Sequence, residues 1–539
     1  MSAPVVDSTV KPLTPSNGTP SDLDTPGSVG TLVNDYLTGP NQAGQTKTES
    51  GSGQSSPTSA TVPSINPPTV PFDTTCWPPI AKGRARTLVL CFDGTGDQFD
   101  DDNSNIVTLF SLLKKNDPTR QMCYYQAGIG TYSNPNIAMP GATAIAETLD
   151  QMVAWYLHAH VQEGYEFLMQ NYVAGDKICL FGFSRGAYTA RALAGMLHSV
   201  GLIPQWNKQQ VPFAWKIYQD NTPAGLIRAA EFKATFSINV HIEFVGVFDT
   251  VASVGIISRE LPFAASNHAI ATFRHALSLD ERRVKFKANH FHNEPDISDA
   301  TETKIKENQI GGTLNQTQAL NGKRVNLEEV VNRQPRPETD FKEVWFAGCH
   351  CDVGGGSVSN SEKINLARIP LKWMIQESIA TNTGILFDLA LLDSIGLTVH
   401  NLPLPKNVPY PPIPGASLKV LPEDPKSLVP EEEKEEALSK VYDQLSLAWF
   451  WWILEILPLR TKHLTVTGHF VRGYPWPNLG NGRGIPDPHV HGLNIHRSVK
   501  LRMETIGYIP KAFWEDKQGK RRLLDIKKPE ELPPINWVD

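Results

Sequence analysis

Residues 177–191 read KICLFGFSRGAYTAR, and this stretch decides the fold class. It begins as a short apolar run, as a buried parallel strand does, and continues as an alanine-rich segment that favours helix from Ala187 to about His198. The turn between them, residues 182–186, fits the pattern G-x-S-x-G. A chain that reverses sharply at a serine needs small neighbours, which the glycines two places before and after Ser184 provide. The stretch therefore predicts a nucleophile elbow, and an ordinary glycine-flanked turn is the alternative.

Other apolar runs predict strands at 86–92, 123–127, 241–248 and 343–347, and helical segments lie between them. Strands that alternate with helices imply a mainly parallel sheet with right-handed crossovers. The expected fold class is therefore α/β, with an α/β-hydrolase-like sheet and flanking helices. Ligand sites of such sheets lie beyond the carboxyl ends of the strands. Four reactive side chains fall at or just past predicted strand ends: Asp93, Ser184, Asp249 and His350.

A serine hydroxyl becomes a good nucleophile when a histidine takes its proton and a carboxylate fixes the tautomer of that histidine. Ser184, Asp249 and His350 follow the chain order of an α/β hydrolase, so we expect them to be catalytic. Asp249 as a helix N-cap and His350 as a structural loop histidine are the alternatives. Two other histidines are weaker candidates: His275 is assigned to a helix, and His496 follows no clear strand.

The loops around these residues supply further candidates. Tight loops at strand ends can point backbone amides at a developing oxyanion. We expect oxyanion-hole amides from Arg185 and from either Gly94 or Thr95, and side chains that line the site from Asp93 and Asp352.

Three other chemistries are disfavoured by the same segments. Asp93-Gly94-Thr95 after a strand is typical of haloacid-dehalogenase phosphatases, but Cys91 occupies the position of their aspartate nucleophile. The glycines of that loop lack the spacing of a dinucleotide-binding loop. Adjacent side chains in residues 349–352, Cys-His-Cys-Asp, cannot easily converge on one zinc ion. We therefore expect no metal and no cofactor.

Composition limits the protein class and its location. The chain has 539 residues, a hydrophobic content of 40% and a net charge of −6, which suits a globular protein and does not favour nucleic acid as a partner. We expect no signal peptide and no transmembrane helix, because no apolar run has the required length and position. The six cysteines show no paired framework, so a cytoplasmic location is expected.

The chain divides by composition into three parts. Residues 1–80 are rich in Ser, Thr and Pro and are expected to be disordered. Residues 84–400 form the expected catalytic domain, with a polar insertion at about 289–340, and residues 401–539 form a C-terminal extension that packs on it. The tryptophan-rich segment 447–459 has two interpretations: a core helix, or an interfacial helix or lid that gives peripheral contact with a membrane.

Five motifs together resemble the type VI secretion phospholipase-effector family, an α/β-hydrolase group with many uncharacterised members in fungi and bacteria. These motifs lie at residues 92–95, 128–131, 182–188, 248–251 and 348–355, and the resemblance runs from about 86 to 373. It implies that Ser184, Asp249 and His350 form the triad. It also implies ester hydrolysis, with phospholipid acyl esters as the substrate of the bacterial effectors.

The resulting expectation is a serine hydrolase that cleaves carboxylic esters of a lipid or phospholipid through an acyl-enzyme. The alternative is a catalytically idle scaffold that recruits partners or membranes on the same fold, and a phosphatase or metallohydrolase comes third. The sequence does not specify an oligomeric state.

Overall fold

The computed structural model describes residues 76–78, 85–95, 97–128, 142–251, 261–264, 267, 269–291, 338–398, 401–403, 431–449, 451–456, 461–464, 470–473 and 478–539. The chain divides into two units, 1–67 and 68–539, and every described residue belongs to the second. Nearly all of the predicted tail and most of the predicted polar insertion lie outside the described residues.

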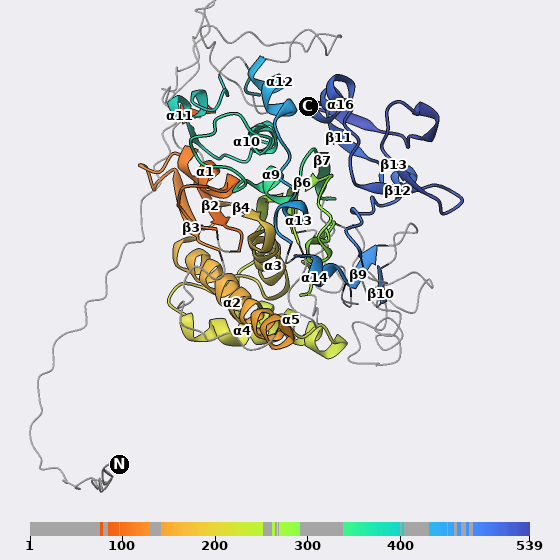
Figure 1. Cartoon of the computed structure of the whole chain (residues 1–539). Coiled ribbons are helices and arrows are strands. Elements are labelled where there is room, and N and C mark those ends of the chain that lie inside the picture. Colours follow the sequence, from red (N-terminus) through yellow and green to blue (C-terminus); the bar gives the residue numbers. More distant parts are fainter. Residues whose placement is uncertain are drawn as a thin grey trace, which may run out of the picture. The chain divides into compact units, whose positions relative to one another are not determined.

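A sheet of eight parallel strands runs through the described unit (Figure 1). In spatial order the strands are β14 (Asn536–Val538), β11 (Asn494–His496), β7 (Asp340–Phe346), β6 (Ile270–Ser278), β5 (Ile242–Phe248), β4 (Lys177–Phe183), β2 (Thr87–Phe92) and β3 (Gln121–Gln126). Phe183 lies opposite Phe248 in the register, and Phe92 lies opposite Gly182. The carboxyl ends of the central strands therefore meet at one edge, and the α/β-hydrolase-like class expected from the sequence is confirmed.

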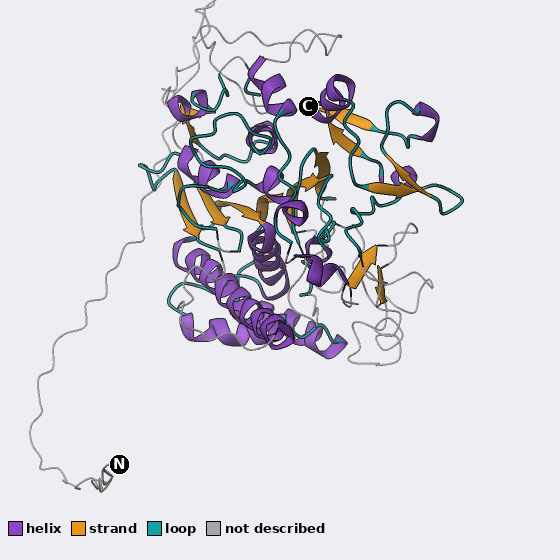
Figure 2. Ribbon diagram, in the orientation of Figure 1, coloured by secondary structure: helices purple, strands orange, loops and turns teal. Residues whose placement is uncertain are grey.

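Helices cover both faces of this sheet (Figure 2). Alternate strand residues point to opposite faces, so Leu88 and Leu90 join one core while Val89 and Cys91 join the other. The first core includes side chains of α2 (Ala142–Asn171), α3 (Ser184–Val200), α4 (Val211–Tyr218) and α5 (Pro223–Phe236). The second includes side chains of α1 (Asn105–Leu112) and α10 (Arg368–Ala380).

Shorter elements complete the described unit. The helices are α9 (His350–Gly354), α11 (Leu389–Asp393), α12 (Glu431–Leu438), α13 (Gln444–Leu447), α14 (Trp451–Ile456), α15 (Pro488–His491) and α16 (Arg497–Ile506). The two-stranded pairs are β1 (Cys76–Trp77) with β8 (Phe387–Asp388), β9 (Thr461–Leu464) with β10 (Phe470–Gly473), and β12 (Phe513–Glu515) with β13 (Arg521–Leu523). None of the described helices combines the length and the apolar character needed to cross a bilayer.

The helix predicted around His275 is wrong, because residues 270–278 form strand β6. The local sequence FRHAL is rich in residues that tolerate helix, but partners from neighbouring elements override that preference. Arg274 pairs with Glu377 of α10 at 2.6 Å, and His275 Nδ1 lies 2.8 Å from Glu343 Oε1 of β7. His496 also ends a strand, β11, contrary to the expectation that none preceded it.

The turn between β4 and α3 depends on a close approach of backbones at Gly186. A Cβ placed on Gly186 would lie 2.3 Å from the carbonyl oxygens of Phe92 and Asp93, both at the end of β2. Backbone atoms there cannot move aside without separating α3 from the sheet.

We expect Gly186→Ala to lower the free energy of unfolding by at least about 1–3 kcal/mol, the usual loss on overpacking. Urea denaturation measures this. Gly484→Ala is the matched control, because its Cβ would meet only the Phe513 ring, at 3.6 Å. Equal stability of the two variants would contradict this account of the turn.

Glu343 of β7 connects strand β6 with the segment at residues 290–291. Its carboxylate contacts His275 Nδ1 at 2.8 Å and His290 Nδ1 at 2.9 Å, and it accepts the Phe291 amide at 3.0 Å. Although burial favours the neutral form, His290 and His275 hold the pKa of Glu343 well below its usual range. Because its Nδ1 faces a carboxylate, His275 carries its proton there and accepts the Thr250 amide at Nε2, 3.0 Å away.

We expect Glu343→Gln to lower the free energy of unfolding at pH 7 by about 3 kcal/mol, because a buried charged partner is removed. A carboxylate whose pKa is depressed by folding stabilises the protein above its unfolded pKa, about 4.3, and this stabilisation fades as the pH falls towards the folded pKa. The difference between wild type and Glu343→Gln in urea denaturation should therefore shrink below about pH 4. Exposed Glu231→Gln is the control, and a pH-independent difference for Glu343→Gln would refute the assignment.

Candidate active site

Ser184 lies on the strained turn between β4 and α3. Its φ of +57° falls in the left-handed region, which few non-glycine residues adopt. A Cβ on Gly182 would lie 2.5 Å from the Gly186 carbonyl oxygen, so the turn excludes larger residues at that position as well. Ser184 starts the 17-residue helix α3, whose N-terminal dipole favours negative charge beside it. Strain of this kind at a serine is typical of a nucleophile elbow.

His350 reaches Ser184 from the start of α9. Its Nε2 lies 2.8 Å from Ser184 Oγ, a hydrogen-bonding distance. The imidazole is buried between two aromatic rings, with centroid distances of 4.7 Å to Phe183 and 4.9 Å to Phe286. Burial lowers the pKa of His350, an effect that the Asp249 carboxylate opposes. His350 is therefore neutral near pH 7 and able to accept a proton.

Asp249 follows β5 and completes a chain of three hydrogen-bonded side chains. Its Oδ2 lies 2.5 Å from His350 Nδ1, and its Oδ1 accepts the Ser278 amide at 2.9 Å. The residue is fully buried and has a φ of +39°. The two residues described after it, Thr250 and Val251, are not helical, so the structure gives no support to Asp249 as a helix N-cap. An ionised carboxylate at Nδ1 keeps the proton on that nitrogen and leaves Nε2 to face the serine.

Arg483 is a member of this site that the sequence did not indicate. Its two terminal nitrogens lie 2.5 and 2.8 Å from the two oxygens of Asp249. Although burial alone would raise it, Arg483 and His350 hold the pKa of Asp249 far below its usual range. The local sequence NLGNGRG of residues 478–484 resembles an ordinary loop, and the arginine lies 234 residues from its partner. No local pattern could have revealed this pair.

The predicted oxyanion-hole residues lie together, but they are not equivalent. Arg185 Nη1 donates to Thr95 Oγ1 at 2.8 Å, which places the first loop beside the residue that follows the serine. The Gly94 amide instead donates to Asp93 Oδ1 at 2.8 Å. This bond is internal to the loop, so Arg185 and Thr95 remain the better candidates.

Asp93 and Asp352, the two carboxylates predicted to line the site, accept hydrogen bonds that fix the loops around it. Asp93 is buried and accepts the Ser104 hydroxyl at 2.6 Å and the Tyr125 hydroxyl at 2.7 Å. Asp352 accepts the amides of Cys349 and Tyr442, both at 2.9 Å, and burial raises its pKa to about 6. These contacts fix the loop after β2 and the turn that carries His350.

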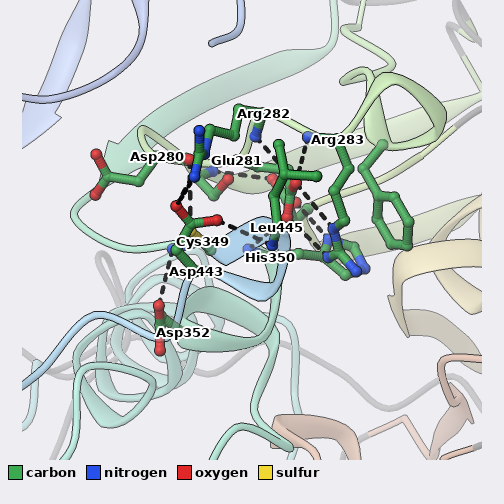
Figure 3. A network of polar contacts seen from close by, with 12 residues as sticks. Asp280, Glu281, Arg282, Arg283, Cys349, His350, Asp352, Asp443 and Leu445 are labelled. Atoms are coloured by element: carbon green, nitrogen blue, oxygen red, sulfur yellow. Dashed lines mark hydrogen bonds and ion pairs between the residues drawn. The ribbon is translucent and has the colours of Figure 1, made fainter. Parts of the chain in front are cut away.

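A polar network behind His350 joins distant parts of the chain (Figure 3). Glu281 pairs with Arg283 at 2.8 Å and accepts the His350 amide at 3.3 Å. Arg282 pairs with Asp443 at 2.7 Å, which links this segment to the C-terminal extension. Glu281 thereby ties the His350 backbone to the segment after β6, and Arg282 ties that segment to the extension.

The Cys-His-Cys-Asp segment does not have the arrangement of a metal site. Both ring nitrogens of His350 face protein partners, and Cys349 Sγ donates to the Asp280 carbonyl at 3.4 Å. Across the described ranges, no three His, Cys, Asp or Glu side chains are grouped as metal ligands.

Comparisons with known proteins place this geometry in a family context. The uncharacterized protein YEL023C of Saccharomyces cerevisiae is 29% identical over 548 residues, covering 78% of this chain and 80% of the relative. A crystal structure of an uncharacterized protein from Pseudomonas aeruginosa aligns at 18% identity and a TM-score of 0.31, covering 56% of this chain and 46% of that one. A structure of the Tle1 effector bound to the VgrG spike of the type VI secretion system aligns at 18% identity and a TM-score of 0.24. The alignment covers 52% of this chain and 53% of that one.

This chain thus spans about half the length of the solved structures that it matches. The family model described as T6SS phospholipase effector Tle1-like, catalytic domain, matches residues 86–377, more than half of the chain. The match covers Ser184, Asp249 and His350 but not Arg483. The chain therefore belongs to the Tle1-like family of T6SS phospholipase effectors.

Proposed function

We propose that this protein is a serine hydrolase that cleaves carboxylic esters of lipids, with phospholipid acyl esters as the first candidates. The observation that carries the proposal is the continuous hydrogen-bond chain from Ser184 through His350 to Asp249, built on a strained turn. Membership of a phospholipase-effector family supports lipid esters as the substrate class.

In the proposed mechanism, His350 Nε2 takes the Ser184 proton as Oγ attacks the ester carbonyl. Negative charge then develops on the carbonyl oxygen, and the amides of Arg185 and Thr95 are the proposed donors to it. His350 returns the proton to the departing alcohol, which leaves an acyl-Ser184 ester. A water then gives a proton to His350 Nε2 as its oxygen attacks the acyl carbonyl, the carboxylic acid leaves, and His350 returns the proton to Ser184 Oγ. Asp249 keeps the imidazole in the productive tautomer and stabilises the imidazolium.

An apolar rim near the site favours a substrate that arrives from a lipid surface. Its members are exposed side chains of the C-terminal extension: Leu447, Trp449, Ile456 and Leu479, of which Trp449 is 77% exposed. Neighbouring Trp451 packs against Phe286 at 5.6 Å, and Phe286 in turn packs against His350. Exposed tryptophan beside aliphatic side chains is typical of the membrane interface. We propose that this rim makes peripheral contact with the membrane.

We also propose a cytoplasmic location. All six cysteines lie in the described part of the chain, and none of them forms a disulfide there, as a reducing compartment allows.

The mechanism predicts a large loss of activity when Ser184 or Asp249, the two ends of the hydrogen-bond chain, is replaced. Ser184→Ala should lower kcat on a soluble ester on the order of 10⁶-fold and abolish labelling by a fluorophosphonate. Asp249→Asn should lower kcat about 10⁴-fold, because the imidazole then adopts the wrong tautomer. Ser199→Ala, at a buried serine further along α3, is the control and should label as wild type does. An unlabelled wild type would favour the idle scaffold, and a labelled Ser184→Ala would overturn Ser184 as the nucleophile.

The apolar rim predicts a surface-specific effect. Trp449→Ser should reduce the ratio of vesicle to soluble-ester activity about 10-fold, because partial burial of an indole in lipid contributes about 1.5 kcal/mol. Trp206→Ser is the matched control, since Trp206 is 85% exposed and belongs to a different segment. Equal ratios in the two variants, measured on phosphatidylcholine vesicles and a soluble ester, would argue against the rim.

A further inference from the structure

Arg483 comes from a part of the chain outside the matched catalytic domain, yet it contacts the acidic member of the proposed triad. The match ends at residue 377, and Arg483 lies in the loop that precedes α15. Its side chain is 3% exposed and forms a two-pronged ion pair with Asp249. A guanidinium presents its donors in a planar fork, so this pairing fixes the orientation of the carboxylate as well as its charge.

The position of the Arg483 fork is itself fixed by the site. Its Nε and Nη2 donate to the Phe286 carbonyl at 3.0 and 2.6 Å. The Phe286 ring packs against His350, so one arginine connects the carboxylate to the wall behind the imidazole. Among the described residues, Asp249 accepts hydrogen bonds from Arg483, His350 and the Ser278 amide.

The loop that carries Arg483 is anchored along its length. Glu455 of α14 accepts the Gly480 amide at 3.1 Å, and its other carboxylate oxygen accepts the Val284 amide. On the other side, the Arg483 carbonyl accepts the Phe513 amide at 3.0 Å. The C-terminal extension therefore fixes the position of the Arg483 backbone through hydrogen bonds on both sides of the loop.

From this geometry we propose that Arg483 is a positioning residue for the Ser184–His350–Asp249 chain, so that the C-terminal extension completes the catalytic site. The proposal rests on the proposed serine-hydrolase function. Arg483 holds both oxygens of Asp249 so that Oδ2 meets His350 Nδ1. It also offsets the negative charge of Asp249, which would otherwise strengthen proton binding by His350.

This second effect gives a readout that loss of structure alone would not produce. The charged groups near His350 are Asp249 at the end of β5, Glu281 and Arg283 on the segment after β6, and Arg483 behind Asp249. Removing Arg483 leaves Asp249 without its cation, so the imidazolium becomes easier to form. Because the reaction needs neutral His350, the acid limb of activity should move to higher pH.

The test compares wild type, Arg483→Ala, Arg483→Lys and the control Arg502→Ala by the rate of fluorophosphonate labelling against pH. Arg502 is also buried and in the extension, but its guanidinium donates to the carbonyls of Ala437 and Ser439. Arg483→Ala should label about 10²-fold more slowly, the loss expected from a misplacement of about 1 Å, with its acid limb about one pH unit higher. Arg483→Lys keeps the charge without the planar fork. Its labelling rate should therefore fall less than that of Arg483→Ala, and its acid limb should stay close to that of wild type.

Guanidinium chloride, far below denaturing concentrations, should restore part of the labelling rate of Arg483→Ala, and sodium chloride of equal ionic strength should not. Arg502→Ala should keep the wild-type pH profile per folded molecule. If wild type labels but both Arg483 variants keep its rate and profile, the positioning role is wrong and the serine-hydrolase function stands. If Arg483→Ala does not fold, the test rests on Arg483→Lys. A folded Arg483→Lys that labels as fast as wild type, with the same pH profile, overturns the positioning role. If wild type does not label at any pH, the proposed function fails and this inference fails with it.

Discussion

A single buried carboxylate, that of Asp249, determines how the parts of this molecule must come together. An ionised group in an apolar interior is unfavourable unless charges and hydrogen-bond donors surround it. The Ser278 amide at the end of β6 provides one donor, His350 of α9 provides another, and Arg483 of the extension provides the opposite charge. Each partner comes from a different segment. The carboxylate can be buried in its ionised form only when the sheet, the histidine turn and the extension are all in place.

The ion pair between Arg483 and Asp249 is better explained by its effect on the catalytic side chains than by a contribution to the stability of the fold. A buried ion pair often stabilises a fold no more than well-packed apolar side chains would, because both charges lose their hydration. What the pair does provide is orientation, since the fork fixes both carboxylate oxygens. It also moderates the pull of Asp249 on the His350 proton. Burial between Phe183 and Phe286 acts on His350 in the same direction, towards the neutral form that a general base needs.

Short-range patterns in the sequence are enough to predict the elements that depend on neighbouring residues alone. The elbow around Ser184, four other strands of the sheet and the α/β-hydrolase-like class follow from apolar runs and glycine spacing. The local sequence predicts a helix where strand β6 lies, because Arg274 and His275 interrupt its apolar pattern, and only their partners Glu377 and Glu343 explain their burial. Arg483 was missed because its role depends on a contact across 234 residues. The place of Gly94 and Thr95 in a loop predicts that one of them supplies an amide, whereas the bond of the Gly94 amide to Asp93 depends on side-chain geometry. The catalytic roles of Ser184, Asp249 and His350 stay a prediction until activity is measured.

The same contacts bear on where the catalytic unit ends. A boundary at residue 400 would separate β11 and β14 from a sheet in which β11 pairs with β7 at Ile495 and Trp345. It would leave β7 as an edge strand, and His496, which stacks on Phe346 at 5.0 Å, would no longer cover that ring. It would also remove Arg483 and leave the buried charge of Asp249 without its cation. We infer that residues 84–400 and the extension act as one catalytic unit, because the sheet edge and the site both depend on residues beyond 478.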